Sequence, residues 1–310
     1  MTHIKPWPPI EPFNHFYLEQ QHHRIYVEQC GNPQGMPVLV IHGGPGGGCN
    51  AAMRQCFDPK RFHIILFDQR GCGRSTPLGN TEHNTTDDLI HDMEQIRQQL
   101  NIEHWILFGG SWGSTLSLIY AIRHPKQINH LILRGIFLGT RHEKAWIYEP
   151  NGCAHFQPQA YAHFIEGINP NEVVKDYNEK LKTNNLKLAT QWAYWEIINS
   201  QLTVADETLA HAQEPAFAMG LAKLSAHYFH HDFFIEDDYI LKHIDQIKHI
   251  PCYMVHGRYD LLCPVMHAVR LAQALPLAHL SISPEAGHSL FEPQNLTSLL
   301  KYIDSTNFTK

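Results

Sequence analysis

A serine between two glycines, Ser111 between Gly109 and Gly113, constrains this chain more than any other feature. Residues 105–108 before it are apolar and of strand length, and residues 115–123 after it have a helical pattern. A strand that turns so sharply into a helix has no room for Cβ atoms beside the serine, and glycine has none. The turn exposes the serine hydroxyl and directs the first amide groups of the helix toward an oxygen that gains negative charge. The pattern therefore predicts that Ser111 is a catalytic nucleophile.

A nucleophilic serine needs a histidine as its base and an acid that orients this histidine. Both residue types follow predicted strands in the last third of the chain. Asp260 comes after the apolar residues 252–255, and His288 lies in a loop of small residues after residues 280–282. Because the carboxyl ends of parallel strands share one edge of a sheet, we expect Ser111, Asp260 and His288 to form a catalytic triad. The alternatives are a solvated loop histidine and a helix-capping aspartate.

A glycine-rich loop at residues 42–48 follows another predicted strand, residues 37–41. Glycine allows a backbone amide to approach a substrate oxygen closely. We expect the oxyanion hole to consist of the N–H groups of Gly44 and Trp112. A phosphate-binding loop is the alternative interpretation, but no Lys-Ser or Lys-Thr pair ends the run. Residues 71–76 likewise lack the third glycine of a dinucleotide-binding fingerprint.

The composition of the 310 residues, with 43% hydrophobic and 17% charged residues, is typical of a soluble globular protein. A formal net charge of −6 argues against nucleic acid as a partner. No apolar stretch is long enough to span a bilayer, so no membrane partner is expected. The N-terminal nine residues contain no apolar segment of a secretory signal. Seven cysteines without a CxxC pair indicate reduced thiols, and hence a cytoplasmic protein.

No metal ion or organic cofactor is predicted. The 24 histidines include a group at residues 227–231 that could place two imidazoles on one face of a helix. No HExxH sequence or other ligand set accompanies them, so solvated or hydrogen-bonded side chains are the favoured interpretation. The sequence gives no prediction of the oligomeric state.

Near-continuous apolar strands alternate with helical segments along much of the chain, which predicts an α/β fold with a parallel sheet covered on both faces. An earlier pair of segments, residues 16–18 and 24–27, is expected to form an antiparallel edge. A helix is predicted at residues 87–100. The strand candidates are residues 38–41, 62–67, 105–108, 130–133, 253–255 and 280–282.

The stretch from Ser111 to Asp260 is much longer than two βα units of roughly 30 residues each require. Strand patterns vanish between residues 137 and 235, where helical patterns replace them. We therefore predict a helical cap at residues 137–235, inserted between two parts of the core at residues 1–136 and 236–310.

The chain resembles the proline iminopeptidases, serine peptidases of the α/β-hydrolase fold that release an N-terminal proline. The resemblance covers nearly the whole chain. It implies the α/β-hydrolase fold, the triad of Ser111, Asp260 and His288, and a place for Phe137 in the wall of the pocket that receives the pyrrolidine ring. The matching runs are residues 42–46, 68–75, 109–116, 133–137, 256–260 and 287–289.

A free N-terminal proline carries a positive amine beside an apolar ring, so its pocket needs apolar walls and a carboxylate. In the family two glutamates of the cap supply the negative charge, and the first corresponds to Glu196. An exposed acid on a cap helix is the alternative interpretation of this residue. At the position of the second glutamate this chain has Ser225. Either Glu196 suffices, or an acid such as Asp232 or Glu236 substitutes, or the preference for an amine is relaxed.

The resemblance and the predicted triad together predict a cytoplasmic aminopeptidase that acts on short peptides with an N-terminal proline. One alternative is a capped esterase or amidase with the same triad and a relaxed specificity, which Ser225 favours. A second alternative is a catalytically idle hydrolase fold that serves as a binding module.

Overall fold

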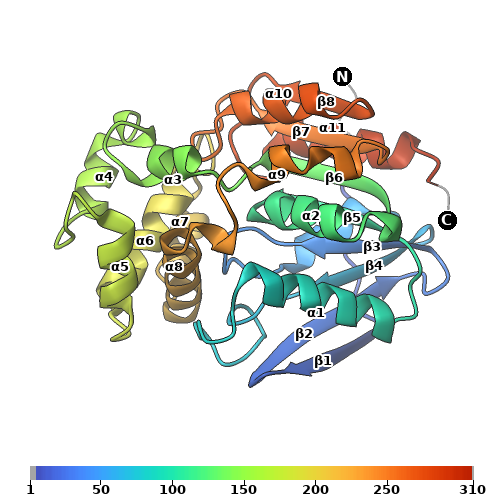
Figure 1. Cartoon of the computed structure of the whole chain (residues 1–310), viewed down its shortest axis with the longest axis horizontal. Helices are drawn as coiled ribbons and strands as arrows, with labels where there is room; N and C mark the ends of the chain where they lie inside the picture. The colour runs from blue at the N-terminus through green and yellow to red at the C-terminus, as the bar shows by residue number, and fades with distance from the viewer. Residues whose placement is uncertain (1–4, 309–310) are drawn as a thin grey trace.

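The eight strands of the described chain form one sheet, in the order β1-β2-β4-β3-β5-β6-β7-β8 (Figure 1). The computed structural model describes residues 5–308. All neighbours from β4 to β8 pair in parallel, whereas β2 is antiparallel to both β1 and β4. The strands are β1 (Asn14–Gln20), β2 (His23–Gly31), β3 (Met36–Ile41), β4 (Phe62–Phe67), β5 (Trp105–Ser111), β6 (Ile128–Ile136), β7 (Cys252–Gly257) and β8 (Ala278–Ser283).

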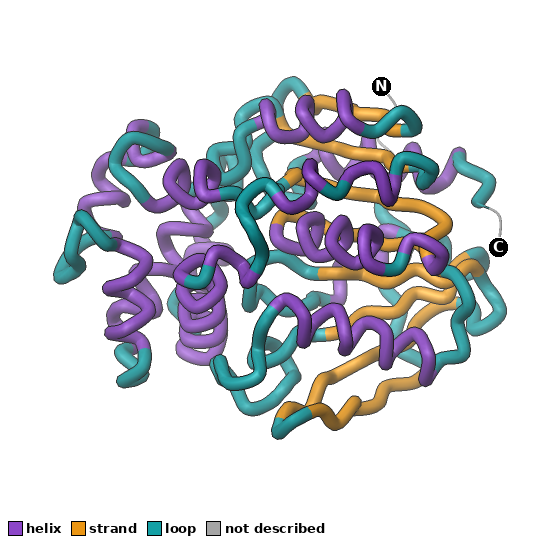
Figure 2. The backbone as a smooth tube through the Cα atoms, in the orientation of Figure 1, coloured by secondary structure: helices purple, strands orange, loops and turns teal. Residues whose placement is uncertain are grey.

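Helices cover both faces of the sheet, because successive apolar residues of a strand point to opposite sides. Leu39 and Ile65 pack in the same hydrophobic cluster as α1, α2 and α10, whereas Val38 and Ile64 pack with α11. Figure 2 shows the layer of helices in front of the strands. The helices of the core are α1 (Thr86–Gln99), α2 (Trp112–Arg123), α9 (Tyr239–Lys242), α10 (Val265–Ala274) and α11 (Pro293–Ser305).

A second group of helices stands at one end of the molecule, beyond the sheet (Figure 1). Residues 137–251, all of them described, contain no strand. Aromatic packing holds these helices together: the ring of Trp192 lies 4.6 Å from that of Tyr148 and 4.9 Å from that of Tyr177. The helices are α3 (Arg141–Tyr148), α4 (Pro158–Phe164), α5 (Val173–Leu181), α6 (Leu186–Ile198), α7 (Asp206–Ala212) and α8 (Pro215–His230). We call this group the cap.

The structure confirms the α/β class, the parallel sheet and the antiparallel pair near the N-terminus. It differs at β2, which pairs with β4 as well, so that only β1 forms this edge of the sheet. The boundaries of the cap at residues 137 and 235 stay a prediction. Residues 1–4, part of the segment in which no secretory signal was expected, lie outside the described residues. No helix in residues 5–308 is long and apolar enough to cross a membrane.

Candidate active site

The predicted nucleophile, Ser111, lies at the junction of β5 and α2 with φ 59° and ψ −128°. These left-handed angles are rare for a residue with a side chain. The two flanking glycines make the turn possible. A Cβ atom at Gly109 would lie 2.2 Å from the carbonyl oxygen of Gly113, and one at Gly113 would lie 2.1 Å from that of Ile41. The backbone geometry is that of a nucleophile elbow.

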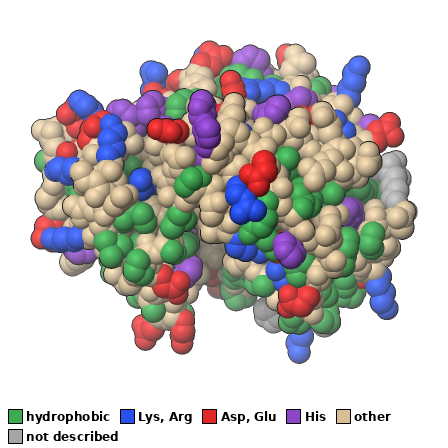
Figure 3. All heavy atoms as spheres, turned by 90° about the horizontal axis from the view of Figure 1, so that it is seen from below, with side chains coloured by type: hydrophobic (Ala, Val, Ile, Leu, Met, Phe, Trp, Pro, Cys, Tyr) green, Lys and Arg blue, Asp and Glu red, His purple; other side chains and the backbone are tan. Residues whose placement is uncertain are grey.

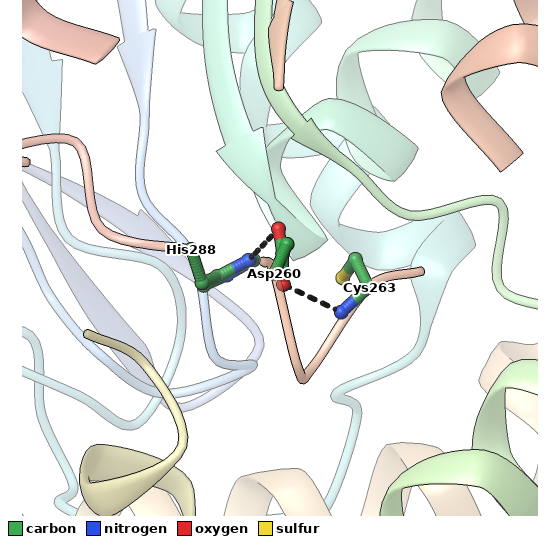
Figure 4. A group of neighbouring side chains, drawn as sticks. All are labelled: Asp260, Cys263 and His288. Atoms are coloured by element: carbon green, nitrogen blue, oxygen red, sulfur yellow. Dashed lines mark hydrogen bonds and ion pairs between the residues drawn. The ribbon is translucent and has the colours of Figure 1, made fainter. Parts of the chain in front are cut away.

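Asp260 and His288 are joined by a hydrogen bond of 2.7 Å between Oδ2 and Nδ1 (Figure 4). The other carboxylate oxygen, Oδ1, accepts the backbone N–H groups of Leu262 at 3.1 Å and Cys263 at 2.7 Å. Burial opposes ionisation of Asp260, but the neighbouring His288 and His256 and the backbone of Cys263 together hold its pKa below the usual value. Asp260 is therefore a fixed anion that orients the imidazole of His288.

The three predicted triad residues come together at the carboxyl edge of the sheet. Ser111 ends β5, Asp260 follows β7 and His288 follows β8. Ser111 and His288 both line one cavity. Open α/β sheets place their sites at this edge. The structure thus brings together residues that are far apart along the chain, as the predicted triad requires.

Two further residues at this site were not predicted. Cys263 lines the same cavity as Ser111, and burial followed by the charge of Asp260 raises the pKa of its thiol well above the usual value. Arg134 donates from Nη1 to the carbonyl oxygen of His288 at 2.7 Å. Burial lowers the pKa of Arg134, and the charge of Asp260 opposes this effect. The sequence does contain a signal for each residue. Cys263 stands three residues after Asp260, and Arg134 stands near the end of the predicted strand that became β6.

A metal ion is a poor fit to this cluster. Ligand atoms of Asp260, Cys263 and His288 lie within 4.8 Å of one another, as Figure 4 shows for the three side chains. Both oxygens of Asp260 are already engaged in hydrogen bonds, and burial keeps the thiol protonated. The groups are arranged as donors and acceptors for each other rather than as free ligands.

The glycine loop at residues 42–48 lies next to the predicted nucleophile. Gly43 and Gly44 line the same cavity as Ser111, and Gly44 has a φ of +116°. Trp112 is the first residue of α2, so its N–H group has no acceptor within the helix. Of the two predicted oxyanion donors, Gly44 lies in the loop that shares the cavity with Ser111, and Trp112 directly follows Ser111.

The segment at residues 68–75 holds this loop in place through hydrogen bonds. The N–H group of Gln69 donates to Nε2 of His42 at 3.0 Å, and its side-chain amide donates to the His42 carbonyl at 2.9 Å. Asp68 accepts the N–H of Cys49 at 2.8 Å and the Nε–H of Arg74 at 2.7 Å. Gln69 also accepts the indole N–H of Trp112 at 2.8 Å. This segment therefore fixes both ends of the loop and the helix that follows Ser111.

A cavity of about 600 Å³ lies between the core and the cap. Figure 3, viewed from below, shows the surface hollowed between these two parts, with hydrophobic side chains along its rims. Residues from the core, Ser111 and His288, and from the cap, Glu196 and Phe229, line it together with Phe137. Phe137 is 2% exposed and packs edge-on against Phe233, with ring centroids 5.2 Å apart. The wall at Phe137 is apolar, as the resemblance predicted.

Glu196 is the one acid among the described residues that line this cavity. Its Oε1 accepts the hydroxyl of Tyr148 at 2.8 Å and the indole N–H of Trp192 at 2.6 Å. Burial raises the pKa of this carboxyl to about 7, against the hydrogen bonds from Tyr148 and Trp192. The group is therefore poised to ionise fully when a cation lies beside it.

The proposed substitutes for the second glutamate are not in the cavity. Asp232 forms ion pairs with Arg141 at 3.0 Å and with Lys144, and Glu236 pairs with Lys242 at 2.8 Å. Of the three alternatives, the one in which Asp232 or Glu236 replaces the missing acid is therefore not supported, because basic neighbours outside the cavity hold both side chains. Ser225 is fully buried and donates to the carbonyl oxygen of Pro45 at 2.9 Å.

Comparisons with known proteins agree with this architecture. A family model described as the alpha/beta hydrolase fold matches residues 36–294. Solved structures share the fold at low identity. A probable hydrolytic enzyme from Pseudomonas aeruginosa PAO1 has a TM-score of 0.69 at 15% identity, covering 98% of this chain and 97% of that chain. An esterase from Exiguobacterium antarcticum has a TM-score of 0.63 at 19% identity, covering 91% of this chain and 96% of that chain.

Relatives of much higher identity carry one name. The proline iminopeptidase of Xylella fastidiosa (strain Temecula1) is 44% identical, covering 96% of this chain and 98% of its own length. That of Xanthomonas citri is 42% identical over 96% of this chain and 98% of its own length. The proline iminopeptidase of Arabidopsis thaliana is 42% identical, covering 93% of this chain and 78% of its own length. This chain belongs to the proline iminopeptidase family of the α/β hydrolases.

Proposed function

We propose that this protein is a serine aminopeptidase that releases an N-terminal proline from short peptides. The observation that carries the proposal is one cavity lined by Ser111, His288 and the partly buried Glu196. A nucleophile and its base suit acyl transfer, and a carboxylate among aromatic side chains suits a cationic ring. The names of the relatives support the same activity.

In the proposed mechanism the Ser111 Oγ attacks the carbonyl carbon of the first residue and its proton passes to Nε2 of His288. Asp260, bonded to Nδ1, keeps Nε2 free to accept this proton. The N–H groups of Gly44 and Trp112 stabilise the oxyanion. His288 then gives the proton to the leaving nitrogen as the C–N bond breaks. Water hydrolyses the acyl-enzyme by the same steps, which releases proline and restores Ser111.

Specificity is proposed to come from the cap. Glu196 pairs with the protonated amine of the substrate, and Phe137 contacts the pyrrolidine ring. The cavity lies under the cap and measures about 600 Å³, which admits a short peptide end and no folded chain. We also propose a cytoplasmic location, which the seven unpaired cysteines support.

The alternative is a capped esterase or amidase that does not require the amine, and Ser225 in place of a second acid favours it. Three substrates separate these functions: a proline amide with a chromogenic leaving group, its N-acetylated form and a simple acyl ester. We expect fast turnover of the proline amide that has a free amine, and little turnover of the N-acetylated amide. Equal turnover of the acetylated amide would overturn the iminopeptidase proposal.

The control for all three substrates is Ser111→Ala, which removes the attacking oxygen and leaves the cavity in place. Turnover that persists in this variant would show that another group or a contaminant performs the reaction. If the unmutated protein turned over none of the three substrates, a binding module would be the better description.

A further inference from the structure

Helix α8 of the cap rests directly on the glycine loop that is proposed to carry an oxyanion donor. A Cβ atom at Gly46 would lie 2.9 Å from the carbonyl oxygen of Gly220 and 3.1 Å from the Cα of Leu221, both in α8. Only glycine allows this contact between two backbones. The loop therefore has no space to move toward the cap.

One polar contact joins the two elements at the same place. The Ser225 hydroxyl donates to the carbonyl oxygen of Pro45 at 2.9 Å, and Pro45 directly follows Gly44. Ser225 is 0% exposed and Pro45 is buried as well, so water has little access to this carbonyl. A buried acceptor that loses its donor costs free energy, so the hydrogen bond favours this loop conformation over others.

Helix α8 is itself held to the core at a second point. The Tyr228 hydroxyl donates to Oδ1 of Asn84 at 2.8 Å, and a ring nitrogen of His227 lies 3.0 Å from the Asn84 carbonyl oxygen. The same helix contributes Phe229 to the cavity wall. Ser225 thus projects from a fixed helix rather than from a loop.

Ser225 also lies near the proposed amine site, since Phe229, one helical turn later in α8, lines the cavity together with Glu196. Its hydroxyl is directed at the loop that would stabilise the oxyanion. Ser225 is 0% exposed, lies outside the lining of the cavity and has its hydroxyl bonded to Pro45.

We propose that Ser225 is a positioning residue that holds the Gly44–Pro45 segment in the geometry needed for oxyanion stabilisation, and that it does not bind the substrate amine. This inference rests on the proposed function for its substrate and deepens it: the serine at the position of a family glutamate has become part of the catalytic support.

The test compares kcat and KM of Ser225→Ala and Ser225→Cys with the unmutated enzyme, on the free proline amide and on the simple ester. We expect kcat to fall about tenfold in both variants and on both substrates, less than the ~10²–10³-fold loss on removal of an oxyanion donor itself. KM for the free amine should stay within about twofold. Cysteine fills the space but is a weak donor, so it should not restore kcat.

Thr86→Val is the matched control. The Thr86 hydroxyl is also fully buried and also donates to a backbone carbonyl far away in the chain, that of Phe233 just after α8, at 2.5 Å. Loss of this hydroxyl should lower the unfolding temperature by about as much as Ser225→Ala does. It should leave kcat within about twofold of the unmutated enzyme.

Four outcomes would overturn the inference: kcat of Ser225→Ala within twofold of the unmutated enzyme, a rise in KM for the amine alone, full recovery of kcat in Ser225→Cys, or an equal loss of kcat in Thr86→Val. The ester separates this inference from the proposed function. If the unmutated enzyme cleaves the ester but not the proline amide, the function fails, and the kcat values on the ester still decide the role of Ser225.

Discussion

The hydroxyl of Tyr148 in α3 donates a hydrogen bond of 2.8 Å to Oε1 of Glu196 in α6. Trp192, one turn earlier in α6, donates to the same oxygen at 2.6 Å. Two donors from rigid helices fix the carboxyl group before any ligand arrives. A fixed group loses little conformational freedom on binding, so a cation at this site would be bound with less entropic cost than at a mobile side chain.

Glu196→Gln should raise KM for the free proline amide by about tenfold to a hundredfold and change KM for the ester by less than about twofold. The substitution keeps the size of the side chain and removes the charge that would pair with the amine. Steady-state kinetics on both substrates measure the effect. Asp232→Asn is the matched control, because Asp232 is an acid of the same region that pairs with Lys144 outside the cavity. Equal effects on the two substrates would remove Glu196 from amine binding.

The preference for the free amine should depend on pH. Burial raises the pKa of Glu196 to about 7, so in the free enzyme the carboxyl is mostly neutral below this pH and mostly charged above it. The ratio of kcat/KM for the proline amide to kcat/KM for the ester should therefore fall as the pH drops below about 7. The triad acts on both substrates, so any effect of pH on the chemical step cancels in the ratio. In Glu196→Gln the ratio should be flat, and a ratio that still falls would assign the titration to another group.

Asp260→Asn should lower kcat by about 10⁴-fold on every substrate. The amide cannot hold His288 in the tautomer that leaves Nε2 free, although it retains the size of the carboxyl group. Burst kinetics with the chromogenic amide would measure the loss, and circular dichroism would check the fold. Activity within tenfold of the unmutated enzyme would mean that another acid orients His288.

Arg70→Met should destabilise the protein by about 3–5 kcal/mol, because it leaves Asp92 buried without its cation. The two side chains form a pair of hydrogen bonds of 2.7 Å each and are 1% and 0% exposed. Urea unfolding followed by fluorescence gives the change in the free energy of unfolding. Lys182→Met removes the cation of an exposed pair with Glu179 and should leave the midpoint unchanged. A midpoint for Arg70→Met as high as that control would contradict the prediction.

The residues that the sequence predicted best are those whose positions follow from a local sequence pattern. Ser111 is fixed by two glycines within a strand-to-helix turn, and Asp260 and His288 each follow a short apolar strand. These signals extend over a few residues, so one sequence suffices to detect them. The parallel sheet was predictable for the same reason.

The environment of the cavity was harder to predict, because it depends on how distant segments pack. The contact of Ser225 with Pro45 and the bond from Arg134 to His288 each join residues far apart in the chain. Asp232 was considered for the amine site, since no local pattern shows that Lys144 lies beside it. Which face of a cap helix meets the core is a property of the packed structure rather than of helical periodicity.

The cap interrupts the connection between β6 and β7, which are adjacent parallel strands. Such a connection must cross from one edge of the sheet to the other, so it is long in any protein of this fold. Lengthening an already long connection costs little, only about 0.6 kcal/mol for each doubling. New helices can therefore be accepted at this point during evolution while the strand ends that hold Ser111, Asp260 and His288 stay as they are. An enzyme built in this way can acquire a different substrate range by exchange of one continuous segment, and the same segment is the natural unit for designing chimeras.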